Sequence, residues 1–176
     1  RKIAATISRH KIETLYYFKY GEPFLSPTIL DELRIIRGAN PGLRIVVSTN
    51  GMVLDDDTKR EAAMLADLLY FSVDGMSEDT LARYQRGGSF QKAYDNMKAL
   101  VAHRDRAGLR RPEIEWKYVL FNWNDRPSMI RAAIEMAGAA GVDVISFWPT
   151  TVPYYGISWR YRVLPFFRTL GRPSWK

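Results

Sequence analysis

The sequence contains no cysteine among its 176 residues. It therefore cannot form an intrachain disulfide, and it offers no thiolate ligand to a metal. Its two histidines, His10 and His103, are isolated at charged helical ends, so we expect both to be solvated rather than to bind a metal. The sequence also lacks a Gly-rich phosphate loop and the Ser, His and Asp order of a nucleophilic triad.

Long hydrophobic runs are absent as well. No apolar run approaches the length of a membrane span, and residues 1–10 lack the central apolar stretch of a signal peptide. We therefore expect a soluble, cytoplasmic protein. The hydrophobic content of 47% is enough for one domain with a buried core. The chain begins at Arg1, without a methionine and in a helix-like segment, so we expect a fragment of a longer protein.

Acidic residues are fewer than basic ones, 19 against 26, which gives a net charge of +7. Such an excess can attract nucleic acid or anionic lipid. The basic segment 103–111 is interpreted as a solvated helix end. In the segment 158–176, aromatic residues alternate with arginines that could stack on bases or lie on a membrane. We favour a packing arm, or a contact with a further domain, and rank nucleic-acid binding last.

Strand-like and helix-like segments alternate along the chain. The strand-like segments are 11–19, 43–48, 68–73, 113–121 and 142–148. The helix-like segments between them are 26–38, with Ser26 as N-cap and Gly38 as its end, 56–68, 89–104, with Ser89 as N-cap, and 127–137. Strands connected through helices become parallel neighbours with right-handed crossovers. The sequence therefore predicts an α/β fold with a parallel sheet, either flat or curled into a barrel.

The fourth strand-like segment carries a two-residue alternation. Ile114, Trp116 and Tyr118 alternate with Glu115 and Lys117. Because strand side chains point to opposite faces in turn, this pattern indicates one buried face and one solvent-exposed face. It favours an open or partial barrel over a sheet that is covered on both sides.

Polar turns follow all five strand-like segments. They are YGEP at 20–23, STNG at 48–51, SVDG at 72–75, NWND at 122–125 and WPTT at 148–151. In a parallel sheet the carboxyl ends of all strands lie at one edge, where ligands bind in such folds. One such turn alone is ordinary loop chemistry, but five at the same edge favour a ligand site.

Each turn offers a group suited to a ligand contact. Glu22 can accept hydrogen bonds from an ammonium group, and Arg86, in RYQRGGSF before a helix, can bind an anion. The side chains suited to hydroxyl or carboxylate groups are Ser48, Asn50 and Ser72. The glycines that permit a sharp turn or a close approach are Gly21, Gly51 and Gly75.

The order of these motifs resembles the radical S-adenosylmethionine (SAM) enzymes, especially the subgroup with an additional C-terminal cluster-binding, SPASM-type domain. The resemblance covers about residues 12–148 and includes YQRGGSFQKAYDNMKAL and EIEWKYVLFNWND besides the first three turns. It implies a partial (βα)6, TIM-like barrel over residues 1–148 that is incomplete at its N-terminus. Residues 149–176 would then form an aromatic and basic tail that serves as a linker to a further domain.

The resemblance also implies the reductive cleavage of SAM to a 5′-deoxyadenosyl radical, which abstracts hydrogen from a substrate. Gly21, Glu22 and Pro23 match the motif that holds the methionyl ammonium, and Ser72 and Arg86 match the pair that holds the methionyl carboxylate. The further matching positions are Ser48 and Asn50, near the ribose or substrate, Asn122, near the nucleoside, and Asp74, which braces its turn.

One feature departs from the family. Its members hold a [4Fe-4S] cluster through CxxxCxxC, and no serine or histidine of this sequence replaces those cysteines. We expect the cluster loop upstream of Arg1 and the SPASM-type domain beyond Lys176, and we expect these 176 residues alone to be inactive. The full-length protein would use SAM, the cluster and an electron donor such as flavodoxin or ferredoxin.

Two alternatives remain at this point. The chain could be a degenerate, cluster-free barrel that serves as a binding or scaffolding module. It could also be an unrelated α/β enzyme with a phosphate-bearing substrate, which the lack of a Gly-rich loop after a late strand disfavours. The sequence does not identify the substrate, and a peptide, a sugar or a small metabolite are all compatible with it.

Overall fold

A single parallel sheet organises the chain in the computed structural model, which describes residues 1–18 and 20–168. The strand order is β1-β2-β3-β4-β5, and all neighbours are parallel. The strands are β1 (Thr14–Tyr17), β2 (Arg44–Thr49), β3 (Leu68–Ser72), β4 (Glu113–Leu120) and β5 (Val144–Pro149). The predicted α/β fold with parallel strands is therefore confirmed.

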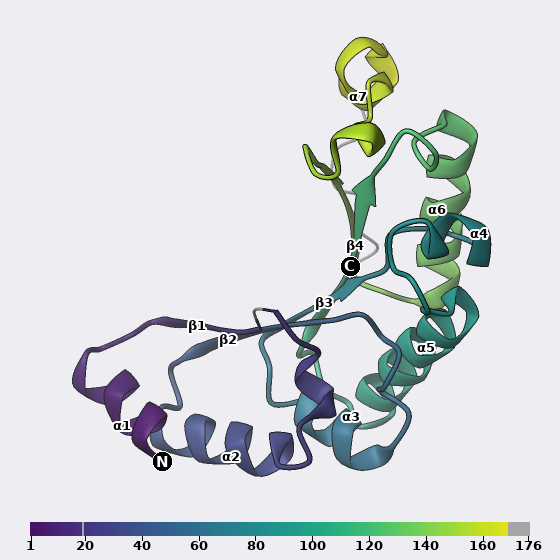
Figure 1. Cartoon of the computed structure of the whole chain (residues 1–176). Helices are drawn as coiled ribbons and strands as arrows, with labels where there is room; N and C mark the ends of the chain where they lie inside the picture. The colour runs from purple at the N-terminus through teal and green to yellow at the C-terminus, as the bar shows by residue number, and fades with distance from the viewer. Residues whose placement is uncertain (19, 169–176) are drawn as a thin grey trace.

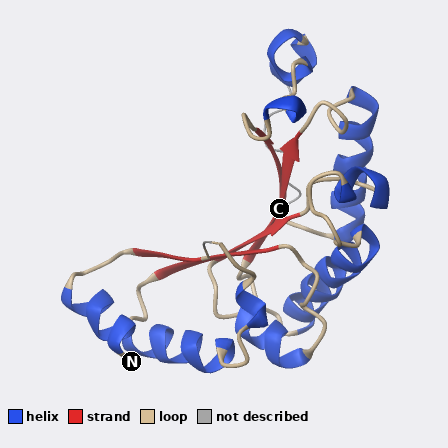
Figure 2. Cartoon of the chain, viewed as in Figure 1, coloured by secondary structure: helices blue, strands red, loops and turns tan. Residues whose placement is uncertain are grey.

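The sheet is curved, and helices cover its convex side (Figures 1 and 2). They are α1 (Lys2–Arg9), α2 (Ile29–Ala39), α3 (Asp57–Ala63), α4 (Glu78–Ala82), α5 (Phe90–Arg106) and α6 (Pro127–Ala140), whereas α7 (Arg160–Val163) lies beyond the carboxyl ends of β4 and β5. Three short 3₁₀ turns complete the order: η1 (Pro23–Leu25), η2 (Tyr154–Gly156) and η3 (Pro165–Arg168). No helix of the described residues lies on the concave side of the sheet, as expected for a partial, TIM-like barrel.

The core lies between the sheet and the helices. Alternate strand residues point toward the helices and are buried, namely Ile45, Val47, Leu69, Phe71, Ile114, Trp116, Tyr118 and Ile145. Burial of each such side chain contributes about 2 kcal/mol. The residues between them in the strands face the concave side, so the functional groups of the sheet gather there.

The predicted boundaries of two helices have different outcomes in the structure. Ser89 is the N-cap of α5 and accepts a hydrogen bond from the Lys92 N–H at 3.3 Å, as predicted. Helix α2, in contrast, has Thr28 rather than Ser26 as its N-cap residue, because 26–28 form a turn whose hydroxyls donate to Glu32. The helix also continues through the predicted end at Gly38 and ends at Ala39.

The expectation of a solvent-exposed face on β4 is wrong at Glu115. Its exposed fraction is 0%, and its carboxylate accepts a hydrogen bond from Ser146. Lys117 is half-buried against the Trp148 ring. The alternation therefore marks the inner face of a curved sheet, where polar side chains partner one another, rather than a surface in bulk water.

The interpretation of 103–111 as a solvated helix end is also wrong in part. Arg104 has an exposed fraction of 0%. Its guanidinium pairs with Asp143 and donates to the Pro112 carbonyl at 3.0 Å. Asp143 also accepts from the Ile114 N–H at 2.7 Å. This buried ion pair links α5 to the amino ends of β4 and β5.

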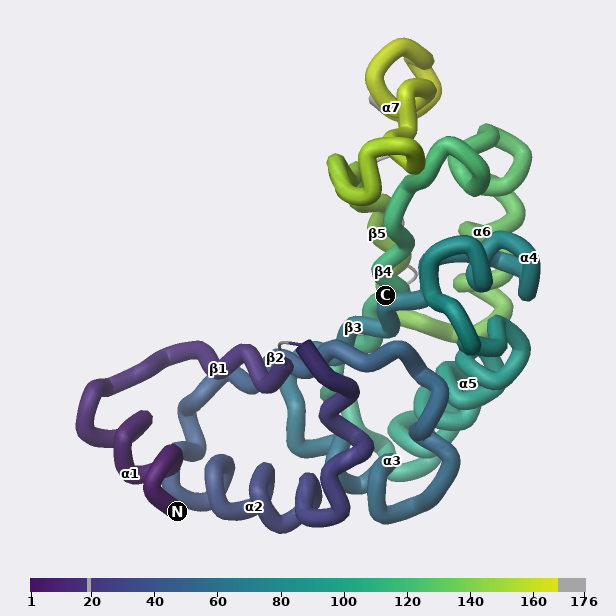
Figure 3. Tube along the Cα trace, viewed as in Figure 1, coloured from purple at the N-terminus to yellow at the C-terminus, as the bar shows by residue number. Residues whose placement is uncertain are grey.

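Residues 150–168 continue past the carboxyl ends of β4 and β5 (Figure 3). Ser158 donates to Asp125 at 2.7 Å, Arg160 donates to the same carboxylate at 2.6 Å, and Phe167 is buried. The first part of the predicted tail is therefore packed against the β4–α6 turn. Its last part, 169–176, and residue 19 of the first predicted strand lie outside the described residues.

Within residues 1–18 and 20–168, no helix has both the length and the apolar character needed to cross a membrane.

We predict that Arg104→Ala lowers the free energy of unfolding by about 3 kcal/mol or more, since it leaves the buried Asp143 carboxylate without its cation. Urea unfolding measures this loss. Arg106→Ala, at an exposed position two residues away, is the control and should change the value by less than about 0.5 kcal/mol. Equal losses in the two variants would contradict the assignment.

Candidate functional site

A polar cleft opens at the carboxyl ends of β1, β2 and β3. Its volume is about 360 Å³, within the range of small-molecule sites. The residues that line it are Phe18, Tyr20, Gly21, Glu22, Ser48, Thr49, Asn50 and Ser72. Three of the five polar turns thus meet in one place, because parallel pairing aligns the ends of their strands.

Glu22 connects the first turn to the second. Its Oε2 accepts a hydrogen bond from the Asn50 N–H at 2.7 Å, and its Oε1 accepts from the Thr49 hydroxyl at 2.8 Å. Oε1 also accepts from the Phe24 N–H at 3.3 Å, which makes Glu22 the N-cap of η1. Pro23 is the first residue of that turn and presets its backbone angle.

The Glu22 carboxylate retains capacity for a ligand. A carboxylate offers about four acceptor positions, and the three intramolecular bonds leave one of them on Oε2. Burial raises the pKa of Glu22 above its ordinary value of 4.5, and the hydrogen bonds from Asn50, Thr49 and Phe24 partly offset this rise. An ammonium group bound at Oε2 would stabilise the ionised form further.

The hydroxyls of Ser48 and Ser72 lie side by side in the cleft, with 3.1 Å between their oxygens. Asn50 is fixed by its side chain, which accepts from the Met52 N–H at 2.9 Å. Asn50 also lines a second hollow of about 370 Å³ together with Gln85, Arg86, Gly87 and Gly88. The two hollows therefore adjoin.

Arg86 is the cation of this second hollow. Its side chain is exposed, and it makes no hydrogen bond or ion pair with any residue in the described part of the chain. A planar guanidinium that is not engaged by a carboxylate can bind a carboxylate or phosphate with two hydrogen bonds. The arrangement thus offers a cation in one hollow and an anion, Glu22, in the next.

Asp74 and Asn122 lie outside the residues that line these hollows. Asp74 accepts from the Val119 N–H at 3.0 Å and from the Gln85 side chain at 3.1 Å, contacts that brace its turn. Burial raises the pKa of Asp74 to about 6, against the effects of those two bonds and of Lys117. The Asn122 side chain donates to the Tyr155 carbonyl at 2.7 Å and so holds the turn at 154–156.

Two glycines of the turns differ in the space around the position that a Cβ would take. A Cβ at Gly75 would lie 2.6 Å from the Thr80 hydroxyl and 2.7 Å from the Leu81 nitrogen, so the close approach of α4 requires Gly75. Gly21 has open space around the position of a Cβ and no positive φ. No contact within the described chain therefore requires glycine at position 21.

Sequence reasoning missed three side chains that hold the site together. Thr49 donates to Glu22, and Gln85 donates to the Ser72 carbonyl at 2.7 Å. Asn124 is fully buried and donates to the Asp74 carbonyl at 3.0 Å. Thr49 and Asn124 lie within the STNG and NWND turns, so these turn motifs could have identified them as site residues. Nothing in the sequence distinguishes Gln85.

Residues 1–108 match the model of the Radical SAM superfamily. The chain belongs to the radical SAM superfamily. The match begins in α1 and runs through α5, so it contains the cleft and the Arg86 hollow. This match identifies the superfamily and does not distinguish the predicted SPASM subgroup from its other members.

Two proteins illustrate what this radical SAM chain is similar to. A tungsten-containing aldehyde ferredoxin oxidoreductase cofactor-modifying protein from Pyrococcus furiosus is 29% identical over 142 residues, which are 77% of this chain and 37% of that relative. The radical SAM methyltransferase TsrM from Kitasatospora setae, solved with tryptophan and a SAM analogue, has a TM-score of 0.61 at 16% identity. That similarity covers 82% of this chain and 28% of TsrM, and it supports the shared fold.

The cluster that the superfamily implies does not fit the residues of this chain. The 176 residues contain no cysteine, and no group of three or more His, Asp or Glu side chains in the described part is placed to hold a metal ion. Soft thiolates are the ligands of such clusters. The charges of the cleft and the adjoining hollow are complementary to those of an amino acid, the part of SAM that carries an ammonium and a carboxylate, since Glu22 retains an acceptor position and Arg86 makes no ion pair in the described part of the chain.

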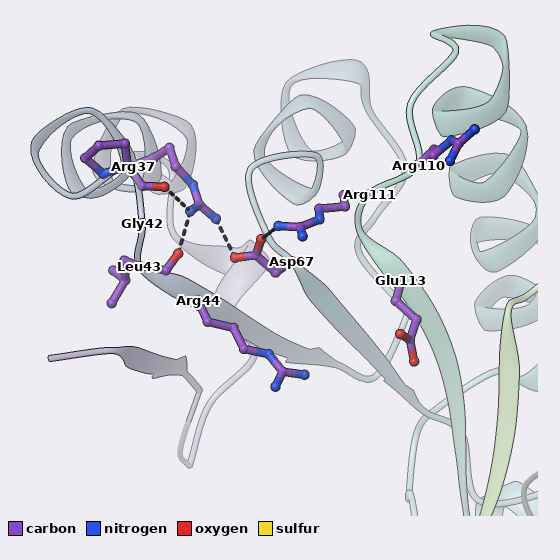
Figure 4. A pocket seen from close by; sticks show the side chains of 9 residues that line it. Arg37, Gly42, Leu43, Arg44, Asp67, Arg110, Arg111 and Glu113 are labelled. Carbon is purple, nitrogen blue, oxygen red and sulfur yellow. Dashed lines mark hydrogen bonds and ion pairs between the residues drawn. The ribbon is translucent and has the colours of Figure 1, made fainter.

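A larger hollow, of about 530 Å³, lies at the opposite edge, beside the amino ends of β2, β3 and β4 (Figure 4). Four arginines surround it, but Asp67 accepts from Arg37 at 2.7 Å and from Arg111 at 2.6 Å. Arg37 also donates to the Leu65 carbonyl at 2.9 Å. Arg37 and Arg111 are thus paired within the chain, and we assign their network with Asp67 a structural role.

We predict that Asp67→Asn lowers the free energy of unfolding by about 2 kcal/mol at neutral pH. Burial, the largest effect, would raise the pKa of Asp67, but Arg37, the Ile45 N–H and Arg111 together lower it below the ordinary value of 3.8. The ionised form therefore stabilises the fold above that pH, and the advantage of the wild type should shrink as the pH falls below it.

Urea unfolding of both proteins over a pH series tests this. The control is Glu61→Gln, because the Glu61–Arg34 pair is more than half exposed on both sides and should contribute less than about 1 kcal/mol. A difference between wild type and Asp67→Asn that does not depend on pH would refute the assignment.

Proposed function

We propose that this chain forms the SAM-binding part of a radical SAM enzyme, which cleaves SAM reductively and abstracts hydrogen from a substrate that is not identified. One observation carries the proposal. The cleft at the carboxyl ends of β1–β3 presents an anion, Glu22, and adjoins a hollow that presents a cation, Arg86, which has no ion pair among the described residues. The amino acid part of SAM carries the two opposite charges.

Each residue has a role in this proposal. Glu22 accepts a hydrogen bond from the methionyl ammonium through Oε2, while Ser72 and Arg86 bind the methionyl carboxylate. Ser48 and Asn50 contact the ribose or the substrate. Bound SAM supplies the 5′-deoxyadenosyl group that becomes the radical. The proposal covers the binding and orientation of SAM, because these 176 residues do not fit the cluster.

The finer assignments are also proposals. A SPASM-type subgroup, an oxidoreductase or maturase activity and flavodoxin or ferredoxin as electron donor follow from the resemblance of the motifs. The relative from Pyrococcus furiosus is named for modifying the cofactor of a tungsten enzyme, which supports a maturation role for this protein. A peptide, a sugar and a small metabolite remain the candidate substrates.

The second candidate function is a cluster-free binding or scaffolding module. The absence of cysteine favours it, and so does the bracing role of Glu22, which would keep this residue useful without SAM. SAM binding separates the two functions, since a module that lost its chemistry has no need for the free acceptor position on Glu22.

We predict that Arg86→Met and Glu22→Gln each weaken SAM binding to the full-length protein by about tenfold, the loss expected for one charge-assisted hydrogen bond. Isothermal titration calorimetry measures the affinity. Arg83→Met is the control, because Arg83 is also exposed and lies outside both hollows. Unchanged affinity in both site variants would refute the site.

We also predict that SAM affinity falls as the pH is lowered into the range where Glu22 takes up a proton. Burial raises the pKa of Glu22, so this loss begins at a higher pH than for an ordinary glutamate. Glu22→Gln should remove this part of the pH dependence. Calorimetry over a pH series tests it, and identical pH profiles of wild type and variant would contradict the prediction.

A further inference from the structure

The inner face of the sheet carries a second charged feature beside the cleft. Ser72 of β3, Lys117 of β4 and Ser146 of β5 are register partners and form one row across three strands. Side chains in such a row point to the same face. Ser72 lines the cleft, so Lys117 stands one strand away from it on the concave side.

Two aromatic rings flank the Lys117 ammonium. Its Nζ lies 4.5 Å from the centroid of the Trp148 ring and 6.0 Å from that of Tyr70. The Trp148 Nε1–H donates to the Ser146 hydroxyl at 2.8 Å, and that hydroxyl donates to Glu115. The position of the indole is therefore fixed, and 45% of Trp148 remains exposed to the open side of the sheet.

Lys117 forms no ion pair within residues 1–18 and 20–168, although its charge acts on the nearby Asp74 carboxylate and lowers the pKa of that group. The half-buried ammonium makes no hydrogen bond and no ion pair there, although it carries three donors. The hydrogen bonds of the nearby carboxylates go to other groups: Asp74, in the turn after β3, accepts from the Val119 N–H and Gln85, and Glu115, on β4 itself, accepts from Ser146. Aromatic faces attract the charge but accept no strong hydrogen bonds. A half-buried cation in this state favours an anionic ligand.

We propose that Lys117, with Tyr70 and Trp148, forms a subsite that binds an oxyanion, a carboxylate or a phosphate, of the substrate. The apolar or planar part of that substrate would lie against the exposed face of Trp148. The subsite is separate from Arg86, which binds the carboxylate of SAM. Its identification as a substrate site rests on the proposed function, since it places the substrate beside SAM.

NMR titration of the full-length protein with three probes, benzoate, phenyl phosphate and neutral benzamide, tests the subsite. The indole N–H signal of Trp148 reports binding and is assigned from its absence in Trp148→Phe. Both anions should shift this signal saturably. Lys117→Met should weaken anion binding about tenfold and leave benzamide unchanged, whereas Lys117→Arg should retain the preference for anions. The tighter of the two anions identifies the substrate group.

The matched control is Lys98→Met, because Lys98 also lies over an aromatic ring, 5.7 Å from the Tyr94 centroid, but on the exposed surface of α5. It should bind the probes like the wild type. Three results would overturn the subsite: no shift with either anion, the same anion affinity in Lys117→Met as in the wild type, or equal losses of anions and benzamide.

SAM titrations of the same variants separate this inference from the proposed function. If Glu22→Gln and Arg86→Met both leave SAM binding intact while Lys117→Met loses the anions, the proposed SAM site fails and the anion subsite stands. If Lys117→Met weakens SAM as strongly as it weakens benzoate, Lys117 binds the carboxylate of SAM, and the substrate subsite is refuted.

Discussion

The parallel pairing of the five strands is the constraint on which the rest of the structure depends. Each strand returns to the same starting edge through a helix outside the sheet, and these helices cover one side (Figure 2). The other side stays open and concave, and all carboxyl ends meet at one edge. The turns around Glu22, Asn50 and Ser72, which are distant in sequence, therefore line a single cleft.

Polar side chains of the turns keep this edge in place. Glu22 accepts from the Asn50 N–H, and Asp74 accepts from the Val119 N–H. Asn124 donates to the Asp74 carbonyl. Each bond satisfies a backbone group that a loop would otherwise leave to water. A site preorganised in this way binds a ligand with less loss of loop entropy. Glu22 thus combines a structural role with a free acceptor position.

Charged side chains at the two edges of the sheet differ in their ion pairing. At the amino edge Asp67 bridges Arg37 and Arg111, so these three charges stabilise the fold (Figure 4). At the carboxyl edge and on the concave face, Arg86 and Lys117 have no ion pair in the described part of the chain. Stability and binding are therefore separated along the strands, as is typical of barrels built from parallel strands.

The sequence by itself determined the element order, the parallel sheet and the polar turns, because alternation, helical spacing and turn residues are local signals. The ion pair of Arg104 with Asp143 and the burial of Glu115 depended on tertiary structure, since partners on different elements decide whether a charge is solvated. The same holds for Lys117, whose neighbours Tyr70 and Trp148 belong to other strands. Only the curvature of the sheet placed the polar residues of β4 on a concave face beside the candidate site, because a flat sheet would expose them to bulk water.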